Sequence, residues 1–159
     1  MNAPASALCL FVPLAARLVL GAAFVYLGTM KALDPVGFLK LVRQFDVLPQ
    51  PLALNVVAAA LPWFEIFCGG LLLAGIRLRG TALVTLVLLL AFTSLILLRA
   101  LALARSGALP FCGISFDCGC GTGEVLVCAK LAENTGLLLL ALHVLFSPAR
   151  HRTRLPAPA

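Results

Sequence analysis

Four of the six cysteines in this chain lie close together, between positions 112 and 128. Cys118 and Cys120 are separated by a single glycine, Gly119, and Cys112 and Cys128 flank them on either side. A disulfide between residues two positions apart needs constrained backbone angles, which glycine tolerates. Because strained disulfides are more easily reduced than relaxed ones, the spacing predicts that Cys118 and Cys120 form a redox-active pair, which Cys112 and Cys128 could join.

Other roles for these four cysteines compete with redox chemistry. They could form two structural disulfides, and the sequence does not choose among the three pairings. They could also bind a metal through four thiolates, although their spacing matches no common zinc or iron–sulfur pattern, so we predict no metal site. The remaining two, Cys9 and Cys68, lie in apolar stretches and are expected to be inert, buried side chains.

The composition predicts that a lipid bilayer surrounds most of the chain. Hydrophobic residues make up 62% of the sequence and charged residues only 11%, whereas a soluble domain has roughly a quarter charged residues. Four stretches reach or approach the roughly 20 residues that a helix needs to cross a bilayer. We therefore expect an all-α membrane protein with a four-transmembrane-helix domain at residues 1–149 (spans at about 8–33, 52–76, 80–99 and 130–147, and a cysteine loop at 105–129) and a basic cytoplasmic tail at 150–159.

A short amphipathic helix is expected between the first two spans. Asp34 supplies a capping side chain and Pro35 is pre-set for a first helical turn. Phe38, Leu41 and Phe45 then repeat at helical spacing and give one apolar face. We predict a short helix that lies in the membrane interface, with a plain polar loop as the alternative.

Two charged side chains, Arg17 and Glu65, fall inside predicted spans. A charge inside a membrane usually faces a partner in the bundle interior. Counted from the outer helix ends, the two residues lie at depths of about 24 and about 21 Å, so we expect an Arg17–Glu65 ion pair. We interpret this pair as a structural clasp rather than a proton or quinone site. Nearer the outer surface, Lys31, Glu133 and Asn134 are expected to meet beneath the cysteine loop.

The positions of the basic residues predict the orientation in the membrane. The raw counts on the two sides are nearly equal, but one side has its arginines directly at helix ends, with no acidic residue beside them. By the positive-inside rule both termini are then cytoplasmic, and the cysteine loop faces the periplasm of a bacterial inner membrane. The net charge of +6 does not indicate nucleic-acid binding, because no basic run is interleaved with aromatic residues.

An ordered set of short motifs extends over nearly the whole chain. In chain order they are Arg17-x3-Gly21-x2-Phe24-x3-Gly28-x2-Lys31, Asp34-Pro35-x2-Phe38, Leu48-Pro49, Leu61-Pro62-Trp63-Phe64-Glu65-x3-Gly69, Asp117-Cys118-Gly119-Cys120-Gly121 and Asn134. The set resembles the MauE/DoxX-like redox-associated membrane proteins, and within them the MauE branch (methylamine-utilisation protein MauE) more than any other.

The resemblance implies a four-helix membrane bundle that works with thioredoxin-like partners. For the MauE branch it implies maturation of the disulfide-rich small subunit of methylamine dehydrogenase in the periplasm. It assigns the redox pair to Cys118 and Cys120, and the intramembrane polar signature to Arg17 and Glu65. The chain departs from the family where Gly121-Thr122-Gly123 replaces the common Phe-Gly. Cys112 and Cys128 are additions to the usual pair, either a second couple that passes electrons or a disulfide that clamps the loop.

We therefore expect a thiol–disulfide relay at the periplasmic face of the membrane. Cys118 and Cys120 would exchange disulfides with a thioredoxin-like partner or a client protein, with Lys130 or a helix N-terminus favouring the thiolate. The reaction requires no cofactor, although a membrane quinone could carry the electrons. The alternatives are a non-catalytic membrane subunit or chaperone with a structural disulfide loop, and a quinone-linked oxidoreductase subunit of the DoxX type that depends on Arg17 or Glu65.

Overall fold

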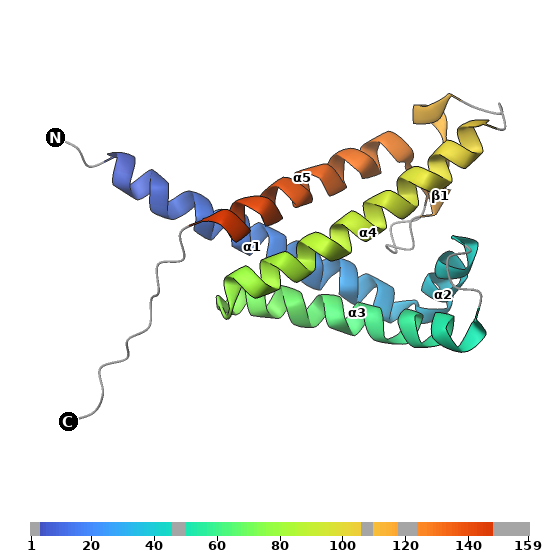
Figure 1. Cartoon of the computed structure of the whole chain (residues 1–159), viewed down its shortest axis with the longest axis horizontal. Helices are drawn as coiled ribbons and strands as arrows, with labels where there is room; N and C mark the ends of the chain where they lie inside the picture. Colours follow the sequence, from blue (N-terminus) through green and yellow to red (C-terminus); the bar gives the residue numbers. More distant parts are fainter. Residues whose placement is uncertain (1–3, 46–49, 106–109, 118–123, 148–159) are drawn as a thin grey trace.

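The computed structural model describes residues 4–45, 50–105, 110–117 and 124–147, and the side chains from residue 12 onward (Figure 1). Four of its helices are long and apolar enough to cross a membrane, which confirms the predicted all-α four-helix bundle of a multi-pass membrane protein. The elements in chain order are α1 (Pro4–Leu33), α2 (Pro35–Gln44), α3 (Pro51–Ala74), α4 (Leu78–Arg105), the 3-10 helix η1 (Phe111–Gly113), β1 (Ser115–Asp117), β2 (Glu124–Leu126) and α5 (Val127–Phe146).

The short helix α2 begins where the sequence predicts. The Asp34 side chain accepts a hydrogen bond from the backbone N–H of Gly37 at 2.9 Å, and Pro35 occupies the first turn. These two features satisfy a backbone donor that the helix itself cannot pair. The apolar face of α2 is buried through Phe38 and Leu41, which pack against Ala58 of α3. The predicted helix is thus confirmed, and the alternative of a plain loop is wrong.

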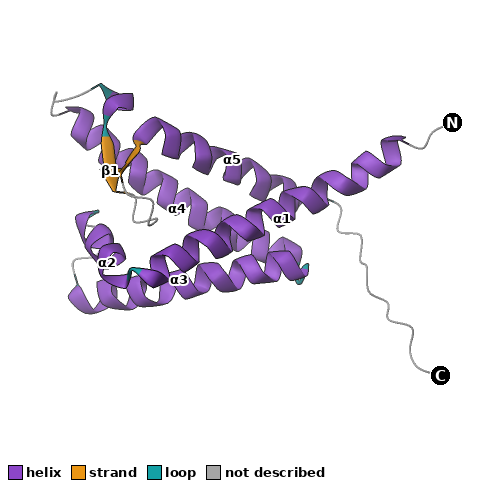
Figure 2. Ribbon diagram, turned by 180° about the vertical axis from the view of Figure 1, so that it is seen from behind, coloured by secondary structure: helices purple, strands orange, loops and turns teal. Residues whose placement is uncertain are grey.

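The four long helices associate as two pairs. Helix α1 packs along α3, and α4 packs along α5, while contacts of α1 with α5 and of α3 with α4 join the pairs (Figures 1 and 2). Small residues permit the close α1–α3 packing, since Gly21 lies against Gly69 and Gly28 lies against Pro62. The apolar core between the pairs includes Leu20, Phe24, Leu72, Leu89 and Ala141.

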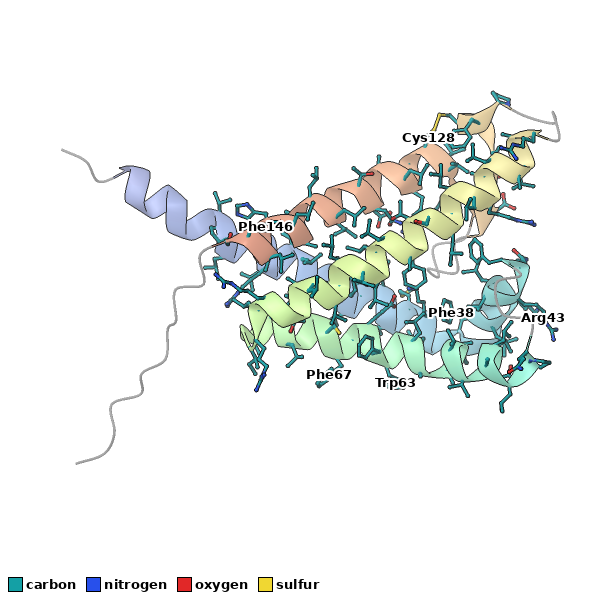
Figure 3. All side chains as sticks on the ribbon, in the orientation of Figure 1. Phe38, Arg43, Trp63, Phe67, Cys128 and Phe146 are labelled. Carbon is teal, nitrogen blue, oxygen red and sulfur yellow. A yellow bond between two sulfur atoms is a disulfide. The ribbon has the colours of Figure 1, made fainter. Side chains whose placement is uncertain are left out.

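Large apolar side chains also cover the outside of the bundle. Trp63 and Phe67 of α3 point away from the other helices (Figure 3), with 66% and 62% of their surface exposed. A soluble monomer rarely carries many such side chains on its surface. Around four apolar helices of membrane-spanning length, these side chains face a lipid bilayer.

The cysteine loop contains regular structure that the sequence analysis did not predict. Strands β1 and β2 pair in antiparallel register, with Phe116 opposite Val125. Helix α5 follows β2 directly, and the N–H of Val127 donates to the carbonyl of Ile114 at 3.0 Å. A small core of Ala100, Ile114 and Val127 joins this region to the end of α4. The sheet and α2 lie at the same end of the bundle, opposite the end where α1 begins (Figures 1 and 2).

Candidate functional site

A disulfide joins Cys112 to Cys128 at the end of the bundle that carries the sheet (Figure 3). Cys112 lies in η1, and Cys128 is the second residue of α5; their Cα atoms are 5.1 Å apart. The bond therefore ties the short 3-10 helix covalently to the first turn of a membrane helix. This bond excludes the two pairings in which Cys112 and Cys128 would each bond to Cys118 or Cys120.

The predicted redox pair lies outside the described residues. Cys118 and Cys120 belong to the segment 118–123, which connects β1 to β2. The pairing of those two strands and the Cys112–Cys128 disulfide both bring the ends of this segment together. The redox role of Cys118 and Cys120 remains a prediction. Within the part of the chain that the structure describes, no three His, Cys, Asp or Glu side chains are grouped to hold a metal ion.

A buried ion pair connects α1 to α3 deeper in the bundle. Lys31 Nζ lies 2.6 Å from Glu65 Oε1, and the two side chains are only 7% and 4% exposed. The Lys31 ammonium also lies over two aromatic rings, 4.3 Å from the ring centre of Phe92 and 5.4 Å from that of Phe38. Contacts with ring faces stabilise a cation that has lost its water.

The predicted Arg17–Glu65 ion pair is wrong, because Glu65 pairs with Lys31. The depth estimate assumed that α1 ends and α3 begins at the same level. The contacts of Gly21 with Gly69 and of Gly28 with Pro62 set a different register. They place the end of α1 beside a point about six residues into α3, which corresponds to an error of roughly 9 Å in depth.

Arg17 instead lies at the far end of α3. A Cβ atom at Gly75 would be 2.5 Å from Arg17 Nη1, so the guanidinium lies directly against the residue that caps α3. The last carbonyls of a helix carry a partial negative charge, and a cation there is stabilised. The Arg17 Nε is buried, and it has no hydrogen-bond partner among the described residues.

Sequence reasoning placed Lys31 near the surface and missed it as the partner of Glu65. One signal was present, because Lys31 continues the helical stripe of Gly21 and Gly28 that contacts α3. Side chains on a helix lean toward its N-terminus, so a lysine near the C-terminal end of α1 reaches back into the bundle. This lean brings the ammonium to the depth of Glu65.

The ion pair forms part of the wall of a small cavity inside the bundle, about 50 Å³ in volume. Its polar wall consists of Lys31, Glu65, Lys130 and Asn134, and the rest is apolar. Lys31 and Asn134 therefore share one cavity, whereas the third residue expected beside them, Glu133, is half exposed and pairs with Lys130 at 3.0 Å. The Asn134 amide donates to Thr93 Oγ1 at 3.2 Å and so links α5 to α4.

The two cysteines outside the cysteine loop do not contribute to the disulfide. Cys68 is a free thiol and is buried in α3, one turn from Glu65, as its apolar neighbourhood suggested. The side chain of Cys9 is outside the described part of the molecule.

Comparison with known proteins identifies one relationship. A family described as methylamine utilisation protein MauE matches residues 9–147, which include all four long apolar helices and the cysteine loop. No curated protein and no solved structure matches the chain.

Proposed function

The chain belongs to the MauE family, and from this membership and its cysteine geometry we propose that it is a membrane thiol–disulfide redox protein. It presents Cys118 and Cys120 at the periplasmic face of the bacterial inner membrane. There it exchanges disulfides with a thioredoxin-like partner or assists the oxidation of a periplasmic enzyme, such as the small subunit of methylamine dehydrogenase.

One observation supports this proposal most directly, the Cys112–Cys128 disulfide. It joins η1 covalently to the first turn of the membrane helix α5, and the segment that contains Cys118 and Cys120 lies in the chain between these two elements. The segment of six residues between β1 and β2 is too short to carry its thiols far from the bundle. A client must therefore come to the membrane surface to react.

The exchange proceeds through a mixed disulfide. A thiolate of the client attacks one sulfur of an oxidised Cys118–Cys120 pair, and the other cysteine leaves as a thiolate. A second client thiolate then attacks the client sulfur of the mixed disulfide. The products are a client disulfide and a reduced Cys118–Cys120 pair, which passes its two electrons to a thioredoxin-like partner, to a membrane quinone, or to Cys112 and Cys128.

Trapping the mixed disulfide tests the proposal. With Cys120→Ser the Cys118 thiolate still attacks the disulfide of an oxidised partner and releases one partner thiolate, but no Cys120 thiolate is left to displace the mixed disulfide. A cross-linked species therefore accumulates on non-reducing gels, and mass spectrometry identifies its partner. Cys68→Ser is the matched control, because Cys68 is buried and distant in sequence from the cysteine loop. Unchanged oxidation of periplasmic clients in a Cys118→Ser/Cys120→Ser strain argues decisively against the relay.

The proposed orientation places both termini in the cytoplasm. Alkaline phosphatase fused within the cysteine loop is then active, and the same enzyme fused after residue 149 is inactive. A cytoplasmic signal from the loop would exclude exchange with periplasmic partners.

A second candidate function is a non-catalytic membrane subunit or chaperone that uses disulfides only to hold its loop. The observation that favours it is that Cys112 and Cys128 are already joined in a cross-link between two structural elements. Thiol trapping in growing cells separates the candidates. A relay shows Cys118 and Cys120 in a mixture of reduced and oxidised states, whereas a structural loop is oxidised throughout.

A further inference from the structure

Charged and polar side chains from three helices meet inside the membrane domain. Lys31 of α1, Glu65 of α3, and Lys130 and Asn134 of α5 line the same cavity, and each is at most 6% exposed. Ionisable side chains are expensive to place inside a membrane, and there they commonly mark a path or site for ions, protons or substrates. The Cys112–Cys128 disulfide gives no reason for these four polar side chains to be buried together.

One carboxylate oxygen of this group has no hydrogen-bond partner in the part of the chain that the structure describes. Glu65 Oε1 accepts from Lys31 Nζ, but Glu65 Oε2 is buried with no partner among the described residues. A buried carboxylate oxygen without a donor is strongly unfavourable, so a bound molecule that donates a hydrogen bond is expected beside it.

The volume of the cavity limits which molecule can bind there. A cavity needs about 10–15 Å³ to hold one water molecule, whereas an engineered cavity that binds benzene measures about 150 Å³. The cavity beside Glu65 has a volume of about 50 Å³, which is enough for a few water molecules and about a third of the volume of the benzene-binding cavity.

We propose that this cavity binds water inside the membrane domain and that Glu65 exchanges a proton with that water. In the exchange, the Glu65 carboxylate accepts a proton from a hydronium ion, which leaves a neutral carboxyl group and a water molecule. The reverse step returns the proton. The cavity and its charged side chains are the evidence for this site, which does not require the cysteine chemistry.

The surroundings of Lys31 stabilise its ammonium group whether Glu65 is charged or neutral. When the carboxyl group is charged, the ion pair holds the ammonium; when it is neutral, the ring faces of Phe92 and Phe38 still do. The other titratable groups near Glu65 are Lys130 on α5 and the Cys68 thiol on α3. Helices α2 and α4 contribute only apolar side chains to the cavity wall.

Radiolytic footprinting of the full chain in lipid nanodiscs tests for the water. Hydroxyl radicals formed from bound water oxidise the side chains beside it, so Phe92 and Phe38 are expected to react several-fold faster than Phe67. Phe67 is the control because it is 62% exposed on the outside of α3, where it faces lipid. Equal, slow oxidation of the three rings means a dry cavity and overturns the proposal.

Labelling with dicyclohexylcarbodiimide tests for the proton. This apolar reagent reacts with protonated carboxyl groups, so modification of Glu65, measured by peptide mass spectrometry, is expected in acidic buffer and falls as the pH rises. Lys31→Met removes the counter-charge and raises the labelling several-fold. Absence of Glu65 labelling in acidic and in alkaline buffer overturns proton exchange.

A second variant keeps the test valid if Lys31→Met fails to fold. Phe92→Leu removes the ring that supports Lys31 when Glu65 is neutral, so it lowers the labelling of Glu65. Phe67→Leu makes the same side-chain change at a lipid-facing position and leaves the labelling as in the parent chain. Equal labelling of Glu65 in the two phenylalanine variants would show that the Phe92 ring does not stabilise Lys31 when Glu65 is neutral. It would thereby contradict a site in which Glu65 alternates between a charged and a neutral form.

Discussion

Gly21 of α1 and Gly69 of α3 face each other so closely that a Cβ on either would lie within 3.0 Å of the other's carbonyl oxygen. Two turns along, Gly28 makes a similar contact with the carbonyl of Pro62. In a membrane, close backbone approach is a main source of helix association, because lipid is as apolar as the helix surface. The two contacts fix the register of α1 on α3, and this register brings Lys31 to Glu65.

Gly69→Ala is therefore expected to destabilise the bundle by about 1–3 kcal/mol, since the added methyl group meets backbone atoms that cannot yield. Gly70→Ala is the matched control, because a Cβ at that position meets no atom within 4 Å. Alanine there should be neutral or stabilising by up to about 1 kcal/mol through its higher helix propensity. The free energy of unfolding in detergent measures both, and equal losses would contradict the close α1–α3 contact.

Breaking the Lys31–Glu65 pair from one side is expected to cost about 3–5 kcal/mol, because Glu65 must then either keep a buried charge without its partner or take up a proton. Lys31→Met should show this loss in the free energy of unfolding. The double variant Lys31→Met/Glu65→Leu should recover most of it, since no uncompensated charge remains.

Glu133→Gln is the control, because it removes a carboxylate from a lysine pair whose acidic member is exposed rather than buried. Glu133 also pairs with a lysine, but its own side chain is 51% exposed and Lys130 still shares the cavity with Glu65, so removal of the Glu133 charge should cost less than removal of Lys31. If the double variant were no more stable than Lys31→Met alone, the loss in Lys31→Met would not come from an unpaired buried charge on Glu65.

The sequence predicted those parts of the fold that depend on local signals. The cap at Asp34 and the proline after it act within one helical turn, and the start of α2 follows from them. The four long helices follow from uninterrupted apolar length. The Arg17–Glu65 prediction failed because it depended on a register between two helices, which the contacts of Gly21 and Gly28 set and no local pattern records.

The disulfide pairing could not be predicted for a similar reason. Cys112 and Cys128 are 16 positions apart, and their approach depends on the strand pairing of residues 115–117 with 124–126. Strands of three residues are too short to show a clear alternation in the sequence. The roles of Cys118 and Cys120 remain predictions from spacing and family resemblance.

Gly75→Ala should destabilise the end of α3 for two separable reasons. Gly75 has φ of 76°, a left-handed conformation that costs a residue with a side chain about 1–2 kcal/mol. Its added methyl group would also displace the Arg17 guanidinium. In the double variant Arg17→Ala/Gly75→Ala the guanidinium is absent, so Gly75→Ala adds only the cost of its left-handed backbone conformation. The loss of unfolding free energy in the double variant should therefore be smaller than the sum of the losses in the two single variants.

Gly80→Ala serves as the control for this end of the bundle, because a Cβ there meets no atom within 4 Å. It should leave the free energy of unfolding within about 0.5 kcal/mol of the parent value. Strictly additive losses for Arg17→Ala and Gly75→Ala would show that the guanidinium does not lie against Gly75.

The Cys112–Cys128 disulfide closes a loop of moderate length, so its removal is expected to cost about 3 kcal/mol. The double variant Cys112→Ser/Cys128→Ser avoids a free thiol that could pair wrongly with Cys118 or Cys120. Because the disulfide anchors η1 to the first turn of α5, the loss should be concentrated at that end of the bundle. Amide hydrogen exchange should accelerate in residues 115–117 and 124–126 and stay unchanged in the middle of α3.

The same variant decides whether this disulfide is a clamp or a second redox couple. A clamp predicts that the double variant still forms a mixed disulfide with its client when Cys120→Ser is added, although the loop is less stable. A second couple predicts instead that clients are oxidised once per protein molecule and no further, because electrons leave Cys118 and Cys120 only through Cys112 and Cys128. Counting client disulfides formed per molecule of purified protein, with a membrane quinone supplied as the electron acceptor, distinguishes the two. Single turnover in the variant with multiple turnover in the parent would exclude the clamp as a complete explanation.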